Sequence, residues 1–366
     1  DGWVGVRYGG GDGLSDAYDD EANPSGTVDE LLAVGAFLAD VDGDGIDELV
    51  TKTRDSSSGA NLDSLVYVDP TSSGLPSTYT VAGTHTGAWS GTLGGNAGDV
   101  DGDGFHDVVL DTMLVPGSST GPDWSSAETL VISGSLHYYL SWIDRDLGDV
   151  NGDGYGDFLG VSSGGIAVYH GASSMVGESQ ATDLTMATAS YYFGRQAHSL
   201  GDLDADGYDD VVIVDSGDGA GQVYIYFGTS TGLQSSPGQT LAGGGTSGDH
   251  FGWKVVTGHD FSGDGIADLA ISEPYSDDDV GNVYVYAGST SATFSHHQTL
   301  ASPEGLDDVS ASSLAMLEDV NGDGYGDLVV GRPNASVGGV AHQGRAYLHL
   351  GSPSGIDLFA DQTLEP

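Results

Sequence analysis

The stretch GDVDGDGFHDVVL, from Gly98 to Leu110, concentrates acidic side chains and then continues at once into an apolar, β-branched run. At an effective dielectric constant near 20, two carboxylates in close contact repel each other by roughly 4 kcal/mol. The stretch therefore predicts either a cation among these side chains or a disordered segment. Its four acids within nine residues are Asp99, Asp101, Asp103 and Asp107.

The same pattern occurs six times along the chain, and consecutive copies begin 50 to 59 residues apart. Recurrence at such a period indicates a repeat architecture. Because the acids recur in phase although the residues between them vary, a bound cation is favoured over acid-rich turns that are merely solvated. The acidic runs begin at Asp40, Asp99, Asp149, Asp202, Asp260 and Asp319.

Each repeat contains four predicted strands. An apolar strand follows the acid loop, as in DLVVGRP at 327–333, and an alternating strand comes next, as in GQVYIYFG at 221–228. A short strand such as GQTLAG at 238–243 follows, and a segment such as DHFGWKVV at 249–256 leads into the next acid loop. Four strands per repeat predict one blade of an all-β propeller. A solenoid of β-coils repeats over fewer residues and does not need four different strands.

The whole chain, 1–366, is interpreted as one propeller domain. The first part, 1–30, predicts a half-blade, in which GWVGVRYGG at 2–10 is a third strand and the polar stretch to about Pro24 is the fourth. This count favours seven blades and leaves six blades with an N-terminal extension as the alternative. The missing strands would come from upstream of Asp1 or from another chain. The six full repeats occupy 31–366, with acid loops at 40–48, 99–107, 149–157, 202–210, 260–268 and 319–327.

The loops share one spacing: an acid or amide at positions 1, 3 and 5, glycine at 6, a backbone carbonyl at 7 and an acid at 9. Calcium takes six to eight oxygens at about 2.3–2.6 Å, and the glycine permits the sharp turn. An EF-hand is excluded because position 12 carries no acid and the flanks are strand-like. Ser262 replaces a carboxylate in the fifth loop and predicts a weaker site there. We predict about six calcium ions, held by Asp40, Asp42, Asp44, Ile46, Glu48, Asp99, Asp101, Asp103, Phe105, Asp107, Asp149, Asn151, Asp153, Tyr155, Asp157, Asp202, Asp204, Asp206, Tyr208, Asp210, Asp260, Ser262, Asp264, Ile266, Asp268, Asp319, Asn321, Asp323, Tyr325 and Asp327.

Composition narrows the class of partner. The chain has 55 acids against 8 bases and a formal charge of −47, and the predicted ligands account for fewer than half of the acids. This surplus disfavours nucleic acid and anionic membranes as partners. Cysteine is absent, so disulfides and thiolate metal sites are excluded. No apolar run reaches the roughly 20 residues of a membrane span, and the start at Asp1 suggests that a leader has been removed.

The chain resembles the FG-GAP repeats of integrin α-subunit β-propellers. Phe-Gly occurs at 193–194 and 251–252, and VGRP at 330–333 takes the place of the second half of the motif. The first three repeats lack Phe-Gly, and VSS at 161–163 replaces Gly-Ala-Pro. The resemblance implies a calcium-stabilised propeller that is secreted or displayed at the cell surface. It also implies that the metal loops lie on one face and that protein ligands meet the opposite face.

These observations favour a non-catalytic binding or adhesion module for protein or glycan ligands. The alternative is a structural subunit of a surface layer or filament, assembled from copies of the chain through the incomplete blade. A carbohydrate-active enzyme is the third hypothesis, but the G-x-S-x-G matches at 117–121 and 228–232 fall on turns after the third strand, and we predict no catalytic residue. Aromatic residues near the entries of first strands are candidate ligand contacts, unless they pack between blades: Trp89, Tyr138, Tyr139, Tyr191 and Tyr192.

Overall fold

The computed structural model describes most of the six repeats and short segments of the N-terminal region. The described residues are 4–6, 9–10, 13–14, 20–22, 36–46, 48–55, 62–68, 80–86, 95–110, 113–129, 146–162, 165–173, 181–184, 192–217, 219–276, 281–301, 313–333, 335–337 and 343–364.

Within these residues the chain forms six four-stranded antiparallel sheets, one for each predicted repeat. In every sheet the strands are neighbours in sequence order, so each is a meander, and we number the sheets as blades 1 to 6. Blade 1 is β5 (Ala36–Ala39), β6 (Glu48–Asp55), β7 (Leu62–Val68) and β8 (Thr80–Thr86), and blade 2 is β9 (Gly95–Gly98), β10 (Asp107–Leu110), β11 (Met113–Val115) and β12 (Glu128–Thr129). Blade 3 is β13 (Asp146–Gly148), β14 (Asp157–Ser162), β15 (Gly165–Tyr169) and β16 (Ala181–Leu184), and blade 4 is β17 (Phe193–Gly201), β18 (Asp210–Asp215), β19 (Gln222–Tyr226) and β20 (Gln239–Ala242). Blade 5 is β21 (Val255–Thr257), β22 (Leu269–Glu273), β23 (Asn282–Ala287) and β24 (Ser295–Ala301), and blade 6 is β25 (Ser313–Leu317), β26 (Asp327–Arg332), β27 (Arg345–His349) and β28 (Gln362–Leu364).

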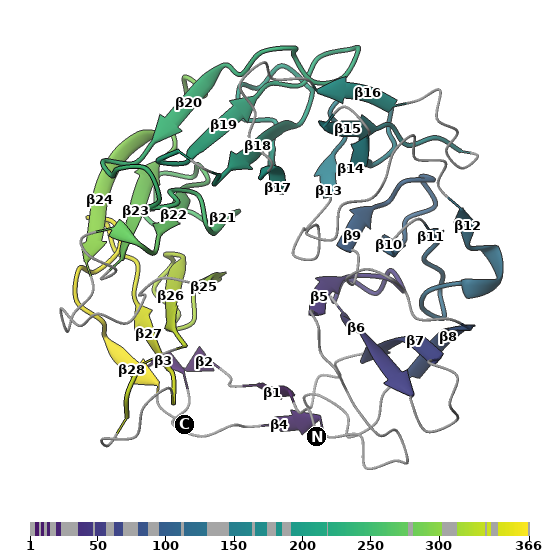
Figure 1. Ribbon diagram of the computed structural model, residues 1–366, viewed down its shortest axis with the longest axis horizontal. Coiled ribbons are helices and arrows are strands. Elements are labelled where there is room, and N and C mark those ends of the chain that lie inside the picture. Colours follow the sequence, from purple (N-terminus) through teal and green to yellow (C-terminus); the bar gives the residue numbers. More distant parts are fainter. Residues whose placement is uncertain are drawn as a thin grey trace.

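The six sheets are arranged around a ring, with the first strand of each sheet innermost and the fourth outermost (Figure 1). This arrangement confirms the predicted all-β propeller of four-stranded blades. Between blade 6 and blade 1 lie two small sheets, in which β1 (Val4–Val6) pairs with β4 (Asp20–Ala22) and β2 (Gly9–Gly10) pairs with β3 (Gly13–Leu14). The count of seven blades and the assignment of 1–30 to a half-blade remain predictions.

The hydrophobic core lies between the blades. Each core cluster joins two neighbouring sheets, for example Leu159 and Ile166 of blade 3 with Val211 and Ile213 of blade 4. Both faces of a central strand are therefore covered, and all six residues of β18 are buried. This double coverage explains why the second strands have continuous apolar sequences rather than alternating ones.

The Phe-Gly pairs fix the entry to a first strand. Phe251 is fully buried and packs edge-to-face on Tyr284, with ring centroids 5.5 Å apart. Gly252 has φ +87°, and a Cβ there would lie 2.9 Å from a methyl group of Val214 in the preceding blade. Because of this backbone, the segment at 249–254 forms turns and β21 begins only at Val255, later than the sequence predicts.

Candidate metal loops

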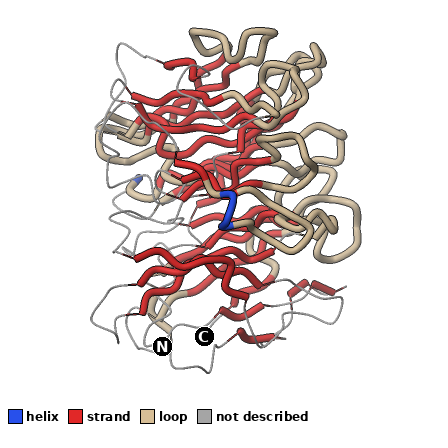
Figure 2. Tube along the Cα trace, turned by 90° about the vertical axis from the view of Figure 1, so that its right-hand side faces the viewer, coloured by secondary structure: helices blue, strands red, loops and turns tan. Residues whose placement is uncertain are grey.

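Each acid loop connects the first strand of a blade to the second. Since neighbouring strands are antiparallel, the turns between third and fourth strands lie at the same end of the sheet. Viewed from the side, most of the described loops gather along one edge of the ring (Figure 2). The turns between second and third strands lie at the opposite edge.

The first acid of a loop organises its backbone. In the second loop one oxygen of Asp99 accepts a hydrogen bond from the N–H of Asp103 at 2.9 Å, and the other accepts from Gly104 at 2.9 Å. Gly104 has φ +94°, a conformation that L side chains rarely adopt. Asp149 and Asp319 accept the same pair of bonds in their loops. The loops therefore have their wrapped shape as a property of the chain itself.

Acidic oxygens converge in three of the loops. Each group offers oxygens that all lie within 4.8 Å of one another: Asp40, Asp42, Asp44 and Glu48 in the first loop, Asp99, Asp101 and Asp103 in the second, and Asp202, Asp204 and Asp206 in the fourth. The other three loops have Asn151, Ser262 or Asn321 at position 3 and so contain one acid fewer.

The first loop contains a buried oxygen that fits a cation. Oδ1 of Asp40 is buried and has no hydrogen-bond partner among the described residues. A buried carboxylate oxygen of this kind is costly unless positive charge or a donor meets it. A set of carboxylate oxygens around one centre is the donor chemistry that calcium prefers. The residues of this loop therefore fit the predicted ion.

The ninth-position acids have a second role as braces. All six are at most 1% exposed. In the second loop, one oxygen of Asp107 accepts from the N–H of Val100 at 3.0 Å and the other from Gly117 at 2.8 Å. Gly117 follows the third strand of the blade, so the carboxylate ties the loop to that strand. The same pair of bonds forms at Asp157, Asp210, Asp268 and Asp327.

Only one of these acids joins the converging group of its loop. Glu48 belongs to that group, whereas Asp107 and Asp210 lie outside the groups formed in the second and fourth loops. Glutamate has one more methylene than aspartate, so Glu48 reaches further while also accepting a bond of 2.8 Å from the N–H of Val41. The direct coordination of an ion by the five ninth-position aspartates remains a prediction.

Burial makes several of these carboxylates hard to ionise in the metal-free chain. Desolvation raises the pKa of Asp107 to about 7 and the pKa of Asp210 to about 6, although backbone N–H groups partly oppose the shift. Burial and the charge of Asp103 raise the pKa of Asp101. At Asp260, burial is outweighed by hydrogen bonds from the N–H groups of Gly265 and Gly263, so its pKa is lowered. A bound cation would favour the ionised form of the carboxylates whose pKa is raised.

The sequence did not predict that His170 contacts the ninth-position acid of its own blade, Asp157. Its Nδ1 lies 3.2 Å from Oδ1 of Asp157, and this carboxylate raises the pKa of His170. The residue precedes Gly171, at a position where blades 2, 4, 5 and 6 have Pro116, Phe227, Ala287 and Leu350. That difference between repeats is the signal that could have identified it.

Most of the ligand contacts that the sequence predicts for the face opposite the loops lie outside the described residues: Trp89, Tyr138, Tyr139 and Tyr191. Tyr192 is described and is half-buried just before β17. Its role in ligand binding remains a prediction.

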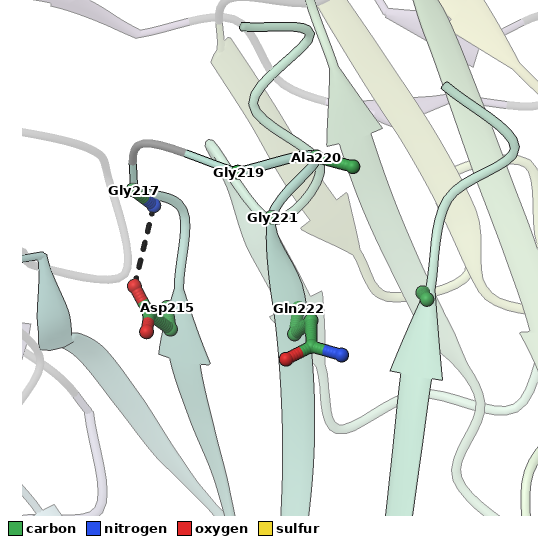
Figure 3. A pocket seen from close by; sticks show the side chains of 7 residues that line it. Asp215, Gly217, Gly219, Ala220, Gly221 and Gln222 are labelled. Carbon is green, nitrogen blue, oxygen red and sulfur yellow. Dashed lines mark hydrogen bonds between the residues drawn. The ribbon is translucent and has the colours of Figure 1, made fainter. Parts of the chain in front are cut away.

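The same face contains a pocket of about 240 Å³ at the turn between β18 and β19. Asp215 and Gln222 lie on these neighbouring strands, and Asp215 accepts a hydrogen bond of 3.3 Å from the N–H of Gly217 (Figure 3). The pocket was not predicted, although the glycine-rich sequence of this turn was the available signal. Its lining is Asp215, Gly217, Gly219, Ala220, Gly221, Gln222 and Ala242.

An aromatic cluster lies next to this pocket. The Nδ1 atom of His250 lies 2.7 Å from the carbonyl oxygen of Ser216, within the turn that forms the pocket. The rings of His250, Trp253 and Tyr275 pack edge-to-face, with centroids 5.4 to 6.0 Å apart. The cluster thus combines apolar area with nearby polar backbone, as binding surfaces often do.

The fold and the loops together define a β-propeller whose blades carry acidic, metal-type loops. The chain matches the FG-GAP repeat at 251–286 and 310–349 and the FG-GAP-like repeat at 149–213. These matches confirm the predicted resemblance to the integrin-like FG-GAP repeats.

Curated relatives are similar over part of the chain. Integrin alpha-6 of Gallus gallus is 34% identical over 84 residues, which are 23% of this chain and 8% of that protein. Integrin alpha-E of Mus musculus is 44% identical over 89 residues, or 22% and 8%. Phosphatidylinositol-glycan-specific phospholipase D of Bos taurus is 32% identical over 189 residues, or 45% and 22%. The matched regions span less than a quarter of each relative.

Solved structures show a more distant similarity. The Photorhabdus luminescens Tc holotoxin pore aligns with 82% of this chain and 13% of its own, at 18% identity and a TM-score of 0.46. Rhamnogalacturonan lyase PL11 of Bacillus licheniformis aligns with 74% of this chain and 48% of its own, at 13% identity and a TM-score of 0.33.

Proposed function

We propose that the chain is an extracellular, calcium-stabilised propeller that acts as a non-catalytic binding or adhesion module. The observation that carries the calcium part is the first loop, where Asp40, Asp42, Asp44 and Glu48 converge and a buried oxygen of Asp40 has no described partner. The integrin-like family supports the binding part. In the described residues no helix is long and apolar enough to cross a bilayer.

Calcium would be held by the acids or amides at positions 1, 3 and 5 of each loop, together with the carbonyl at position 7. Once bound, it would neutralise the carboxylates and clasp the first and second strands of the blade. The chain's own contribution is to hold the loop in shape through the first acid and to anchor it through the buried ninth acid. Free calcium is abundant outside cells, so sites of ordinary affinity would be filled there.

The proposed binding surface is the face opposite the loops, where the pocket at Asp215 and Gln222 lies beside the aromatic cluster. Protein or glycan ligands both fit such a surface. We would test the immobilised protein against a glycan array and a panel of extracellular-matrix proteins, in calcium and in EGTA. Binding that depends on calcium supports the module, and a failure to retain any ligand in calcium contradicts it.

Calcium binding is tested by thermal unfolding followed by circular dichroism. At free calcium 100-fold above Kd, each filled site adds about 2.7 kcal/mol to the free energy of unfolding. We expect EGTA to lower the melting temperature sharply and calcium to restore it, with about six ions counted by native mass spectrometry. Asp44→Asn should weaken the response, whereas Asp357→Asn, an equal charge change at an exposed residue outside the loops, should not. An unchanged melting curve in EGTA would contradict the proposal.

A second candidate function is a structural subunit that assembles through the ring. It is favoured by the position between blades 6 and 1, where the described N-terminal strands form only two-stranded sheets. An incomplete sheet can accept a strand from a neighbouring chain. Light scattering on the chain in calcium tests this function, and a strictly monomeric particle at high concentration counts against it.

A further inference from the structure

Neighbouring metal loops are joined by a repeated backbone hydrogen bond. The carbonyl of the first residue in one loop accepts from the N–H of the eighth residue in the next loop. The bonds run from His106 to Asp40 at 2.9 Å, from Gly156 to Asp99 at 2.7 Å, from Asp209 to Asp149 at 3.0 Å and from Gly326 to Asp260 at 2.9 Å.

A second set of bonds strengthens three of these junctions. The carbonyl of the second residue in a loop accepts from the turn that follows the third strand of the next blade. These bonds run from Ser118 to Val41 at 3.1 Å, from Ala172 to Val100 at 2.9 Å and from Thr229 to Val150 at 3.1 Å.

Side-chain packing joins the same pairs of neighbouring loops. The glycine at position 4 of one loop lies against the aromatic ring at position 7 of the next, so closely that a Cβ would collide with the ring. Only glycine leaves room for this contact. The pairs are Gly43 with Phe105, Gly102 with Tyr155, Gly152 with Tyr208 and Gly263 with Tyr325.

The series is broken between the fourth and fifth loops. Position 4 of the fourth loop is Ala205 instead of glycine, and position 7 of the fifth loop is Ile266 instead of an aromatic residue. Both partners of the packing contact are therefore replaced. The structure describes both loops in full, and it contains no bond from the N–H of Ala267 to the carbonyl of Asp202. The hydrogen bond and the packing are therefore lost at the same junction.

The packing of glycine against an aromatic ring is also missing between the sixth loop and the first, whose blades are separated by the two small N-terminal sheets. A Cβ at Gly322 of the sixth loop would meet no described atom within 4 Å. Ile46, at position 7 of the first loop, is 45% exposed. Among the described residues the loops therefore form two runs, the first to fourth and the fifth to sixth.

One peptide group connects two sites at each intact junction. The peptide between Phe105 and His106 has its carbonyl at position 7, where it is a predicted ligand of the second loop. Its N–H donates to the carbonyl of Asp40, the first residue of the preceding loop. A cation on the carbonyl polarises the peptide and makes the N–H a stronger donor. The hydrogen bond in turn fixes the orientation of the carbonyl, so each site helps to preorganise the other.

We infer that calcium binding is positively coupled between adjacent loops within each run and uncoupled across the junction of the fourth and fifth loops. This inference rests on the proposed calcium binding and adds how the sites are regulated. Coupling between sites typically changes affinity 5- to 150-fold, and it is reciprocal. We expect a change of at least about 5-fold between neighbours in a run.

The test is a calcium titration of the full chain followed by hydrogen–deuterium exchange and mass spectrometry, which gives a midpoint for each loop peptide. Asp153→Asn disables the third loop at an exposed position. It should move the midpoints of the second and fourth loops to at least about 5-fold higher calcium and leave the fifth unchanged. The matched variant, Asp264→Asn in the fifth loop, should move the sixth loop in the same way and leave the fourth unchanged.

The outcomes separate the two proposals. If the wild-type loops show no calcium-dependent protection, the proposed calcium function is wrong. If they do bind but Asp153→Asn leaves the second and fourth midpoints in place, the coupling is wrong and the calcium function stands. A shift of the fourth loop by Asp264→Asn, equal to its shift by Asp153→Asn, would overturn the division into two runs.

Discussion

The buried carboxylate of Asp107 accepts a hydrogen bond of 2.8 Å from the backbone N–H of Gly117. This bond joins the end of the second acid loop to the end of the third strand in the same blade. The other carboxylate oxygen of Asp107 accepts a hydrogen bond from the backbone N–H of Val100, inside the loop. One side chain therefore holds the acid loop and the end of the third strand together, and the same arrangement recurs in four further blades.

Loss of this brace should destabilise the chain even without calcium. Asp107→Ala leaves two buried N–H groups without an acceptor, and each such group costs about 1–3 kcal/mol. We expect a loss of about 2–6 kcal/mol in the free energy of unfolding, measured by urea denaturation in EGTA. The control is Asp103→Ala, whose carboxylate is exposed and should cost less than about 1 kcal/mol. Equal effects of the two variants would refute the bracing role.

The metal-free chain should become more stable as the pH falls from about 8 to 5. Burial raises the pKa of Asp107 to about 7 and the pKa of Asp210 to about 6, above the value of about 3.9 for an unfolded aspartate. The folded chain therefore binds more protons than the unfolded chain in this range, so protonation favours folding. Melting temperatures in EGTA at four pH values check the sign.

Protons that bind to these carboxylates compete with calcium. The stabilisation by added calcium should therefore shrink as the pH falls from about 8 to 5. Asp157 raises the pKa of His170, which adds to the trend, whereas burial lowers the pKa of His349, which opposes it in the same range but is outnumbered by the raised groups. A melting temperature in EGTA that drops steadily from pH 8 to 5 would contradict the assignment of the raised carboxylates.

Ser262→Asp should raise the calcium affinity of the fifth loop. The substitution restores the carboxylate that the first, second and fourth loops have at position 3, and affinity in such loops follows the number of charged ligands. We expect roughly a tenfold lower midpoint for this loop, equivalent to about 1.4 kcal/mol. Ser291→Asp adds the same charge at an exposed position in the neighbouring turn and serves as the control. Similar gains from both would show that general charge, rather than coordination, is responsible.

Position 4 of the loops offers a matched pair of backbone substitutions. Ala205 has φ +60°, which costs an L residue about 1–2 kcal/mol, whereas extra freedom of glycine in the unfolded chain costs about 0.4–1 kcal/mol. Ala205→Gly should therefore raise the free energy of unfolding by about 0.5–1 kcal/mol. Gly102→Ala should lower it, because φ is +74° and the new methyl group would collide with Tyr155. Urea denaturation of both variants in EGTA measures the two signs, and a loss of stability in Ala205→Gly would contradict the strain at this position.

The local part of the architecture could be predicted because it is encoded in contiguous residues. The nine-residue spacing from Asp99 to Asp107 sets the turn, the direction of the acids and the strand that follows. Six such loops in phase with four strands sufficed to predict the propeller. The segment at 249–254 was predicted as extended and forms turns, because His250 and Gly252 adopt positive φ in contact with the neighbouring blade.

By itself the sequence thus determined the repeat, the strands, the acidic loops and the resemblance to FG-GAP repeats. Only the tertiary structure decided that the ninth acids brace the third strands, that His170 meets Asp157 and that the loops form two connected runs. It also decided the pocket at Asp215. The physical reason is distance along the chain: a loop is fixed by neighbours in sequence, whereas the junctions join residues more than 50 positions apart, such as Asp40 and His106. Their contacts exist only once the blades pack around a common axis.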